Sequence, residues 1–180
     1  MFFLKGNQVK DRNNGIASEA KLQKKLNHSY KNEILMATEI KIKNIPQGYQ
    51  SIISNGRHAI MGDEPTPSKG TDLIFSPVDL ILAGISMCKV ATIGNVARRK
   101  GWEIGNVNAQ LSQVVKRGKG GTLTTSVESN INTEVDISDE QRQHLIKHAD
   151  NCDVTRMVRG DWEFFNSTEL VNGADPVLNS

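Results

Sequence analysis

Hydrophobic and polar positions alternate with two different periods along this chain, and the changes of period divide it into elements. Residues Thr38–Lys43 alternate with a period of two, which is typical of a half-buried strand. A second strand is predicted over Tyr49–Ser54 and a third over Arg57–Met61, because Asn55-Gly56 between them favours a tight antiparallel hairpin. Residues 63–71 contain two prolines and a glycine, so we expect a loop there.

The most strongly marked element is a helix over residues 77–100. Ser76 suits its N-cap, Pro77 its first position, and Asp79 supplies the acid of a capping box. Apolar or small side chains then run almost all round the helix, which ends on three basic residues followed by Gly101. Since a helix that is apolar on every side is normally enclosed, we expect this one to be buried in the centre of its domain.

Two further alternating runs and a second helix follow. Asn106–Lys116 and Thr122–Val135 are predicted to form a hairpin. Ser138 suits the N-cap of a helix whose apolar face ends with Cys152, and Trp162–Ser167 is predicted to be a final strand. The order βββ-α-ββ-α-β predicts an α+β fold with antiparallel pairings around one long buried helix.

Composition and charge indicate one folded domain preceded by a basic extension. The chain has 180 residues, of which 37% are hydrophobic, and a formal net charge of +2. Residues 1–35 hold seven Lys or Arg against three Asp or Glu, and Ser18–Leu35 has a weak amphipathic helical pattern. We interpret residues 1–35 as an extension, helical or flexible, and residues 36–180 as the domain.

The hydrophobic runs of the chain also indicate its cellular compartment. The longest apolar run, Leu80–Ile85, is far shorter than the ~20 residues of a membrane span, and the apolar start of the chain is too short for a signal peptide. We therefore expect a cytoplasmic protein whose two cysteines are not a structural disulfide.

Those two cysteines, Cys88 and Cys152, are the main candidates for chemistry. Each taken alone is explained equally well as a small buried hydrophobe, and burial raises the pKa of a thiol and lowers its reactivity. A reactive Cys88 needs a nearby cation, for which Arg57 in the third strand is the candidate. Because both cysteines lie on apolar faces of elements that must pack together, their sulfurs can approach disulfide distance.

The histidines are weaker candidates for chemistry than the cysteines. His144 and His148 have the i, i+4 spacing of two metal ligands, but they share their face with Gln141 and Lys147 rather than with a carboxylate. We therefore expect no metal site and no cofactor. His58 either bonds the neighbouring arginine or is an ordinary surface residue.

Several motifs resemble those of the OsmC/Ohr family, the osmotically inducible and organic hydroperoxide resistance proteins. Residues 76–88, SPVDLILAGISMC, resemble the family's central helix, and residues 151–156, NCDVTR, resemble its second-cysteine motif. Residues 55–58, 63–65 and 69–72 resemble the loop that precedes the helix in the OsmC-like branch. The resemblance covers residues 38 to about 170.

This resemblance implies an OsmC-like fold, an intertwined homodimer and a thiol-dependent peroxidase that needs no cofactor. Cys88 would reduce an organic hydroperoxide or hydrogen peroxide and become a sulfenic acid, and Cys152 would convert it to an intramolecular disulfide. Arg57 would stabilise the thiolate, with Asp79 and His58 in supporting positions. A dithiol or a lipoylated protein would be the reductant, and neither nucleic acid nor membrane would be a partner.

Two departures from the family pattern keep a second hypothesis open. Val78 stands where the Ohr enzymes carry a glutamate, and Asp153 stands where the family carries a proline. These residues favour a redox-silent module that binds a small hydrophobic ligand at the dimer cleft. A third hypothesis, nucleic-acid binding through residues 1–35, predicts a steep salt dependence.

Overall fold

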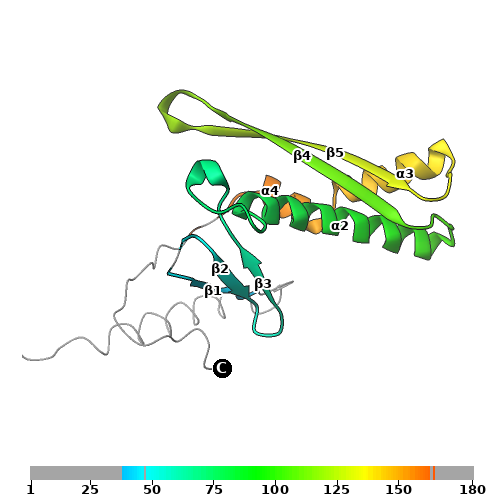
Figure 1. The fold of residues 1–180 in the computed structure, drawn as a ribbon. Helices are drawn as coiled ribbons and strands as arrows, with labels where there is room; N and C mark the ends of the chain where they lie inside the picture. Colours follow the sequence, from blue (N-terminus) through cyan, green and yellow to red (C-terminus); the bar gives the residue numbers. More distant parts are fainter. Residues whose placement is uncertain (1–37, 47, 163, 165–180) are drawn as a thin grey trace, which may run out of the picture. The chain divides into compact units, whose positions relative to one another are not determined.

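The computed structural model describes residues 38–46, 48–162 and 164, and it has the predicted α+β architecture (Figure 1). A three-stranded antiparallel sheet in the order β1-β2-β3 comes first, then a long helix, a two-stranded hairpin and two shorter helices. The elements are β1 Lys41–Asn44, β2 Ser51–Ser54, β3 Ala59–Gly62, α2 Pro77–Lys100, β4 Val107–Arg117, β5 Leu123–Thr133, α3 Asp139–Asp150 and α4 Asp153–Arg159.

The order of elements matches the prediction as far as α3 and then differs. A separate helix, α4, follows α3, whereas the sequence pattern predicts that the second helix reaches Cys152. The break occurs at Asn151, whose side-chain Nδ2 donates to the carbonyl of Lys147 at 2.9 Å and thereby satisfies a carbonyl at the end of α3. Cys152 then adopts an extended backbone and becomes the N-cap residue of α4.

Two predicted elements cannot be compared with the structure. The helical pattern over Ser18–Leu35 lies outside the described residues. The final strand over Trp162–Ser167 also lies outside them, except for Trp162 and Phe164. The rings of these two residues stack with centroids 6.2 Å apart.

The turn between β2 and β3 follows the Asn-Gly signal. Gly56 has a φ of +84°, a conformation that side-chain-bearing residues rarely adopt. The side-chain Oδ1 of Asn55 accepts hydrogen bonds from the backbone N–H groups of Arg57 (3.0 Å) and His58 (2.8 Å). These two residues therefore belong to the turn, and β3 begins at Ala59, two residues later than predicted.

The loop between β3 and α2 is organised by the buried carboxylate of Asp63. This carboxylate accepts hydrogen bonds from the hydroxyl and backbone N–H of Thr71 and from the backbone N–H groups of Glu64 and Leu73. The Thr71 hydroxyl is the largest influence on the pKa of Asp63, and together with these N–H groups it lowers that pKa despite burial. Gly70 lets the loop close, because a Cβ there would lie 1.7 Å from the carbonyl oxygen of Glu64.

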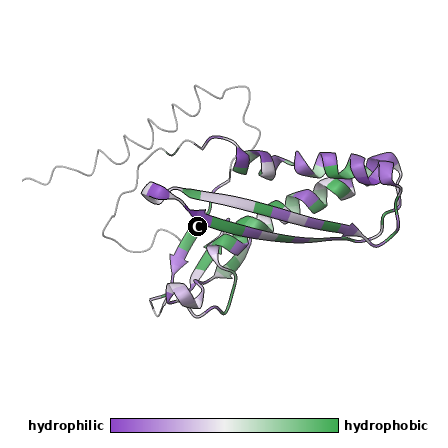
Figure 2. Cartoon of the chain, turned by 90° about the horizontal axis from the view of Figure 1, so that it is seen from above, coloured by the Kyte–Doolittle hydropathy of each residue, from purple (hydrophilic) through white to green (hydrophobic). Residues whose placement is uncertain are grey.

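Helix α2 has the predicted ends. The hydroxyl of Ser76 accepts from the backbone N–H of Asp79 at 3.2 Å, while the Asp79 carboxylate accepts from the backbone N–H of Ser76 at 2.9 Å. Gly101 ends the helix with a φ of +67°. Apolar residues run along most of α2 (Figure 2). By length and composition alone α2 would pass for a membrane span, but so do core helices of soluble proteins.

The expectation that α2 is enclosed on every side is wrong for the single chain. Its buried residues form one stripe with a four-residue spacing, Ile85, Lys89, Ile93 and Ala97. That stripe packs on α3 and β4, which contact α2, whereas Ile81 and Met87 are 55% and 72% exposed. The described chain supplies packing partners for one face of this helix, so its remaining apolar surface faces outward.

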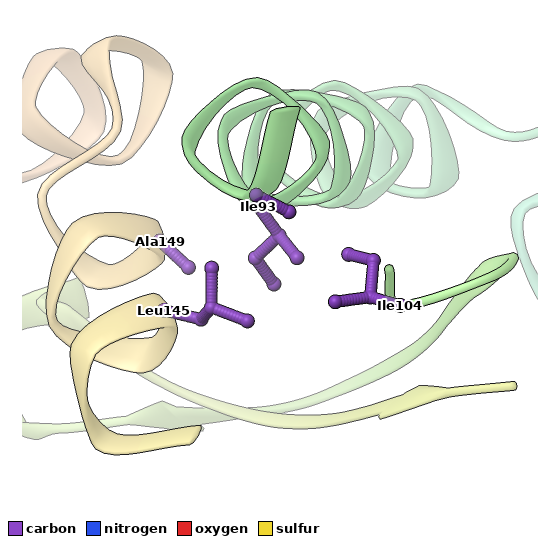
Figure 3. Packing of buried hydrophobic residues seen from close by; sticks show 5 residues of the cluster. Ile93, Ile104, Leu145 and Ala149 are labelled. Atoms are coloured by element: carbon purple, nitrogen blue, oxygen red, sulfur yellow. The ribbon is translucent and has the colours of Figure 1, made fainter. Parts of the chain in front are cut away.

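The hydrophobic core lies between α2, α3 and the segment that leads into β4 (Figure 3). Ile93 of α2 meets Leu145 and Ala149 of α3, with Ile104 closing the cluster. This core fixes α3 against the second half of α2. It thereby determines where the chain leaves α3 and where α4 begins.

We predict that Leu145→Ala lowers the free energy of unfolding by about 3 kcal/mol, because Leu145 is 2% exposed and the substitution leaves a cavity. Chemical denaturation measures the loss. The neighbouring Ile146 is 49% exposed, so Ile146→Ala should change stability by less than about 1 kcal/mol. Equal losses for the two variants would contradict the position of the core.

We predict that Asp63→Asn destabilises the protein at neutral pH and not in acid. The folded pKa of Asp63 is lowered, so its stabilising effect is present above the unfolded pKa of about 3.9 and is lost as the pH falls through the folded value. The urea midpoints of wild type and variant should therefore differ at pH 7 and converge below about pH 4. A difference that is the same at both pH values would show that the carboxylate charge is not what organises the loop.

Candidate functional site

Cys88 lies near the middle of α2 and is half-buried. The backbone N–H of Val154, in the first turn of α4, donates a hydrogen bond to its Sγ over an N–S distance of 3.5 Å. Helices α2 and α4 are in contact. The chain therefore turns back after α3 and places the beginning of α4 against the middle of α2.

Cys152 immediately precedes α4 and is 4% exposed, which agrees with its predicted inward position. Its Sγ and the Oγ1 of Thr155 share a hydrogen bond at 3.0 Å. Thr155 is itself buried, so this hydroxyl is held in place at the thiol. Sequence reasoning missed Thr155. The usable signal was its position, three residues after a cysteine that begins a helix.

The structure brings the two predicted cysteines together. Val154, two residues after Cys152, donates to the Sγ of Cys88, each thiol influences the pKa of the other, and both cysteines are free. Because Cys88 is half-buried and Cys152 is buried, a molecule arriving from solvent reaches Cys88 more easily.

The surroundings of the two thiols shift their pKa values in opposite directions. Burial is the largest influence on the pKa of Cys88 and raises it, and Cys152 and the Asp153 carboxylate raise it further, against the Val154 N–H. Burial by itself also raises the pKa of Cys152. Hydrogen bonds from Thr155 and Cys88, together with the charge of Lys89, outweigh that effect and lower it.

Lys89 is the cation of this site that sequence reasoning did not single out. Its side chain is 6% exposed, and its Nζ forms an ion pair with Oδ1 of Asp150 at 2.6 Å. Lys89 occupies a position in the buried stripe of α2 that is otherwise apolar. A lysine within an apolar stripe, directly after a candidate cysteine, was the available signal.

Arg57 and His58 are not placed at the thiols within the described chain. Both are exposed residues of the β2–β3 turn, where their backbone N–H groups bond to Asn55. The groups that act on the pKa of Cys88 are its backbone donor Val154, Cys152 and Asp153. The role of Arg57 at Cys88 therefore stays a prediction.

Asp79 acts at the beginning of α2 rather than at the thiol. The hydroxyl and backbone N–H of Ser76 bond to its carboxylate and lower its pKa. Asp79 is nine residues before Cys88, which corresponds to about 14 Å along a helix. Its role in the structure is to cap the helix that carries the cysteine.

His144 and His148 lie side by side on α3, with ring centroids 4.8 Å apart, and Trp102 contacts His144 edge-on. Within residues 38–46, 48–162 and 164, no group of three or more His, Cys, Asp or Glu side chains is arranged to hold a metal ion. The aromatic contact with Trp102 shows that His144 serves in packing.

A hollow of about 300 Å³ lies between α2, α3 and β5. Lys89 and Asp150 line one part of it, while Ile131 and Ile146 contribute apolar surface. Neither cysteine lines this hollow. Lys89 is the residue of the candidate site that this hollow shares.

Comparison with known proteins places this arrangement in a family. The sequence profile described as "OsmC-like protein" matches residues 70–164, a range that includes both cysteines and Lys89. No curated protein sequence matches the chain.

Solved structures share the fold at low sequence identity. The organic hydroperoxide resistance protein OhrB of Bacillus subtilis is 19% identical, with a TM-score of 0.54 over 71% of this chain and 94% of that one. An organic hydroperoxide resistance protein from Elizabethkingia anophelis is 20% identical, with a TM-score of 0.57 over 71% and 93%. An OsmC-like protein of unknown function from Vibrio cholerae is 8% identical, with a TM-score of 0.58 over 68% and 94%.

These structures confirm the fold, with its antiparallel sheets and long central helix, and the profile covers more than half of the chain. The chain belongs to the OsmC-like protein family.

Proposed function

We propose that this protein is a thiol-dependent peroxidase that reduces organic hydroperoxides or hydrogen peroxide through Cys88 and Cys152. The thiolate of Cys88 attacks the O–O bond, becomes a sulfenic acid and releases an alkoxide that is protonated to the alcohol. The thiolate of Cys152 then attacks the sulfur of Cys88, and hydroxide leaves as the disulfide forms. A dithiol, free or on a lipoylated protein, reopens the disulfide by thiol exchange.

The observation that carries this proposal is that the beginning of α4, which Cys152 precedes, lies against Cys88 in α2. A peroxidase of this kind needs one sulfur that peroxide can reach and a second sulfur beside it. Cys88 is half-buried, Cys152 is buried, and each thiol influences the pKa of the other. Structural neighbours named as organic hydroperoxide resistance proteins support the same substrate class.

The proposal includes a homodimer, supported by the exposed face of α2. Met87 lies opposite the buried stripe of this helix, and the nearby positions Gly84 and Ala91 are small enough for a close helix–helix approach. An apolar face of this size without a packing partner in the described chain is typical of an interface. In such a dimer the exposed Arg57 of one copy becomes available to Cys88 of the other. Arg57 then keeps the role proposed for it, which is to stabilise the Cys88 thiolate.

Residues 1–35 have no part in the proposed chemistry, and we propose that residues 36–180 act alone in the cytoplasm. The net charge of the chain after residue 35 is slightly negative, with 15 Lys or Arg against 17 Asp or Glu. That balance gives the domain no basic field that would draw nucleic acid.

A second candidate function, a redox-silent module that binds a small hydrophobic ligand, is favoured by one observation. The pKa of Cys88 is raised by burial, and Asp153 adds a negative charge nearby. A thiol in that state reacts slowly with peroxides. The two functions differ in whether the cysteines change oxidation state.

We predict that one equivalent of an organic hydroperoxide converts the reduced protein to a Cys88–Cys152 disulfide, identified by peptide mass spectrometry. Cys88→Ser should abolish peroxide consumption, because it removes the attacking sulfur. Cys152→Ser should leave a sulfenic acid at Cys88 that a sulfenic-acid reagent traps. A wild-type protein that stays fully reduced would instead support the binding module.

The same assay on residues 36–180 tests the role of the extension. We expect the shortened chain to form the disulfide at the rate of the full chain. A rate more than about tenfold lower would assign residues 1–35 to the site and contradict the proposed division.

We predict that the protein is a dimer by light scattering and that Met87→Glu shifts it toward the monomer, because a charge on this apolar face has no compensating partner. Lys119→Glu introduces a glutamate into the β4–β5 turn, an exposed polar segment, and should leave the mass measured by light scattering unchanged. Circular dichroism verifies that both variants keep their helices. A dimer that survives Met87→Glu would exclude this face as the interface.

A further inference from the structure

The hollow between α2, α3 and β5 is charged at both ends of its α3 wall and apolar between them. This wall is one stripe of α3 that begins with Arg142, ends with Asp150 and contains Leu145, Ile146 and Ala149 in between. Arg142 and Asp150 are eight residues apart, which corresponds to about 12 Å along a helix. The hollow, with a volume of about 300 Å³, is therefore long enough for an extended hydrocarbon chain.

The wall formed by β5 repeats this pattern. Ser129, Ile131 and Thr133 are alternate residues of the strand, so their side chains lie on the same face of it. A hydroxyl-bearing residue stands at each end of this wall and an isoleucine in the middle. On the α2 wall, Lys89 lies at the Asp150 end of the hollow, because its Nζ is 2.6 Å from Oδ1 of Asp150.

The apolar middle of the hollow is part of the hydrophobic core. Ile93 packs against Leu145 and Ala149 in the core cluster, and all three residues also line the hollow (Figure 3). The core holds these side chains in place, so the apolar surface is already formed in the protein without a ligand. A pre-formed surface of this kind binds a hydrocarbon with little loss of conformational freedom in the protein.

Lys89 brings hydrogen-bond donors to one end of the hollow. Its side chain is 6% exposed, and its ammonium group has three N–H donors, of which Asp150 accepts one. The others can donate to an oxygen atom of a molecule in the hollow. Because Asp150 is half-exposed, its carboxylate stays solvated while it holds the lysine in place.

Arg142 gives the other end of the hollow a positive charge. Its Nε lies 4.0 Å from Oδ1 of Asp139, whose side chain is 98% exposed. So long and exposed an ion pair contributes little, which leaves the guanidinium able to bind another carboxylate. Arg142 also lies in the first turn of α3, where the helix dipole favours an anion.

The charges that line the hollow indicate a ligand with one negative charge. Lys89 and Arg142 are positive and Asp150 is negative, so one positive charge is left uncompensated among the lining residues. A carboxylate carries one negative charge and forms two parallel hydrogen bonds with a guanidinium. A phosphate monoester carries about −1.5 to −2 and exceeds what the hollow compensates.

We propose that the hollow binds a hydrocarbon-chain carboxylate that carries an oxygen function at the far end of its chain. The carboxylate binds Arg142, the chain lies over Leu145 and Ile146, and the hydroxyl or carbonyl oxygen accepts from the Nζ of Lys89. Every residue of this site comes from one chain, and neither cysteine lines it. The site is therefore separate from the thiol pair and from a dimer cleft, and the inference does not depend on the proposed peroxidase function.

Calorimetric titration of the full chain with three probes of equal length, below their micelle-forming concentrations, tests the class of ligand. ω-Hydroxydecanoate should bind at one site per chain. Decanoate should bind about tenfold more weakly, because it lacks the oxygen that accepts from Lys89. Decylammonium should not bind, because Arg142 repels its charge. Absence of binding by ω-hydroxydecanoate, or equal binding by decylammonium, would overturn the inference.

Variants at the two ends of the hollow test the orientation of the ligand. Arg142→Gln should weaken ω-hydroxydecanoate binding by about tenfold, because it removes a charge-assisted hydrogen bond. Lys147→Gln removes an equal charge from an exposed position of α3 outside the hollow and should change nothing. Lys89→Met should reduce ω-hydroxydecanoate to the affinity of decanoate and leave decanoate itself unaffected. Unchanged affinity in Arg142→Gln, or a hydroxyl preference that survives Lys89→Met, would overturn the assignment.

A variant in the apolar middle distinguishes this site from the rest of the surface. Ile146→Asp places a carboxylate where the chain should lie and should abolish binding, and because Ile146 is 49% exposed the helix tolerates the change. Met157→Asp makes the same kind of change at a residue of α4 that is 48% exposed and outside the hollow, so it should bind normally. Circular dichroism verifies that both variants are folded. Normal binding by Ile146→Asp would overturn the inference.

The Cys88→Ser variant separates the ligand site from the thiol chemistry. It should bind ω-hydroxydecanoate with the affinity of the wild type, because Cys88 does not line the hollow. Loss of binding in this variant would place the ligand at the thiols and overturn the inference. That result says nothing against the peroxidase, which is tested by disulfide formation. Conversely, a protein that binds the probe and never forms the disulfide would reject the peroxidase alone.

Discussion

The contact between the beginning of α4 and the middle of α2 is the constraint on which the candidate site depends. It places the backbone N–H of Val154 on the sulfur of Cys88, and it places Cys152 beside that sulfur with Thr155 behind it. The two cysteines are 64 positions apart in sequence, so this contact alone makes them a pair. The core of Ile93, Leu145 and Ala149 maintains the contact by fixing α3 against α2.

The elements that could be predicted are those whose signals are local. Helix α2 begins and ends as expected because Ser76, Asp79 and Gly101 act on backbone groups within one turn of themselves. The break between α3 and α4 could not be predicted from periodicity, because it is formed by hydrogen bonds from Asn151 and Cys152 to carbonyls at the end of α3. Burial of α2 was overestimated because an apolar pattern reports that a face needs a partner and does not say which chain supplies it.

The site was predictable in its pairing and not in its electrostatics. The apolar patterns of two helices indicated that Cys88 and Cys152 lie near each other, although the contact is made by the beginning of α4 and not by α3. The direction in which the pKa of each thiol shifts depends on distances that a sequence does not contain. Arg57 was the expected cation and lies in an exposed turn, whereas Lys89 looked like an ordinary helix residue and is buried in an ion pair.

The most direct measurement of whether this pair is a redox centre is the number of thiols lost for each hydroperoxide reduced. Free thiols and remaining hydroperoxide are counted in the same sample, with the protein in excess so that further oxidation does not occur. Two thiols should disappear for every hydroperoxide consumed, because one is oxidised and the second closes on it. Hydroperoxide that persists beside an unchanged thiol count would contradict a redox role for Cys88 and Cys152.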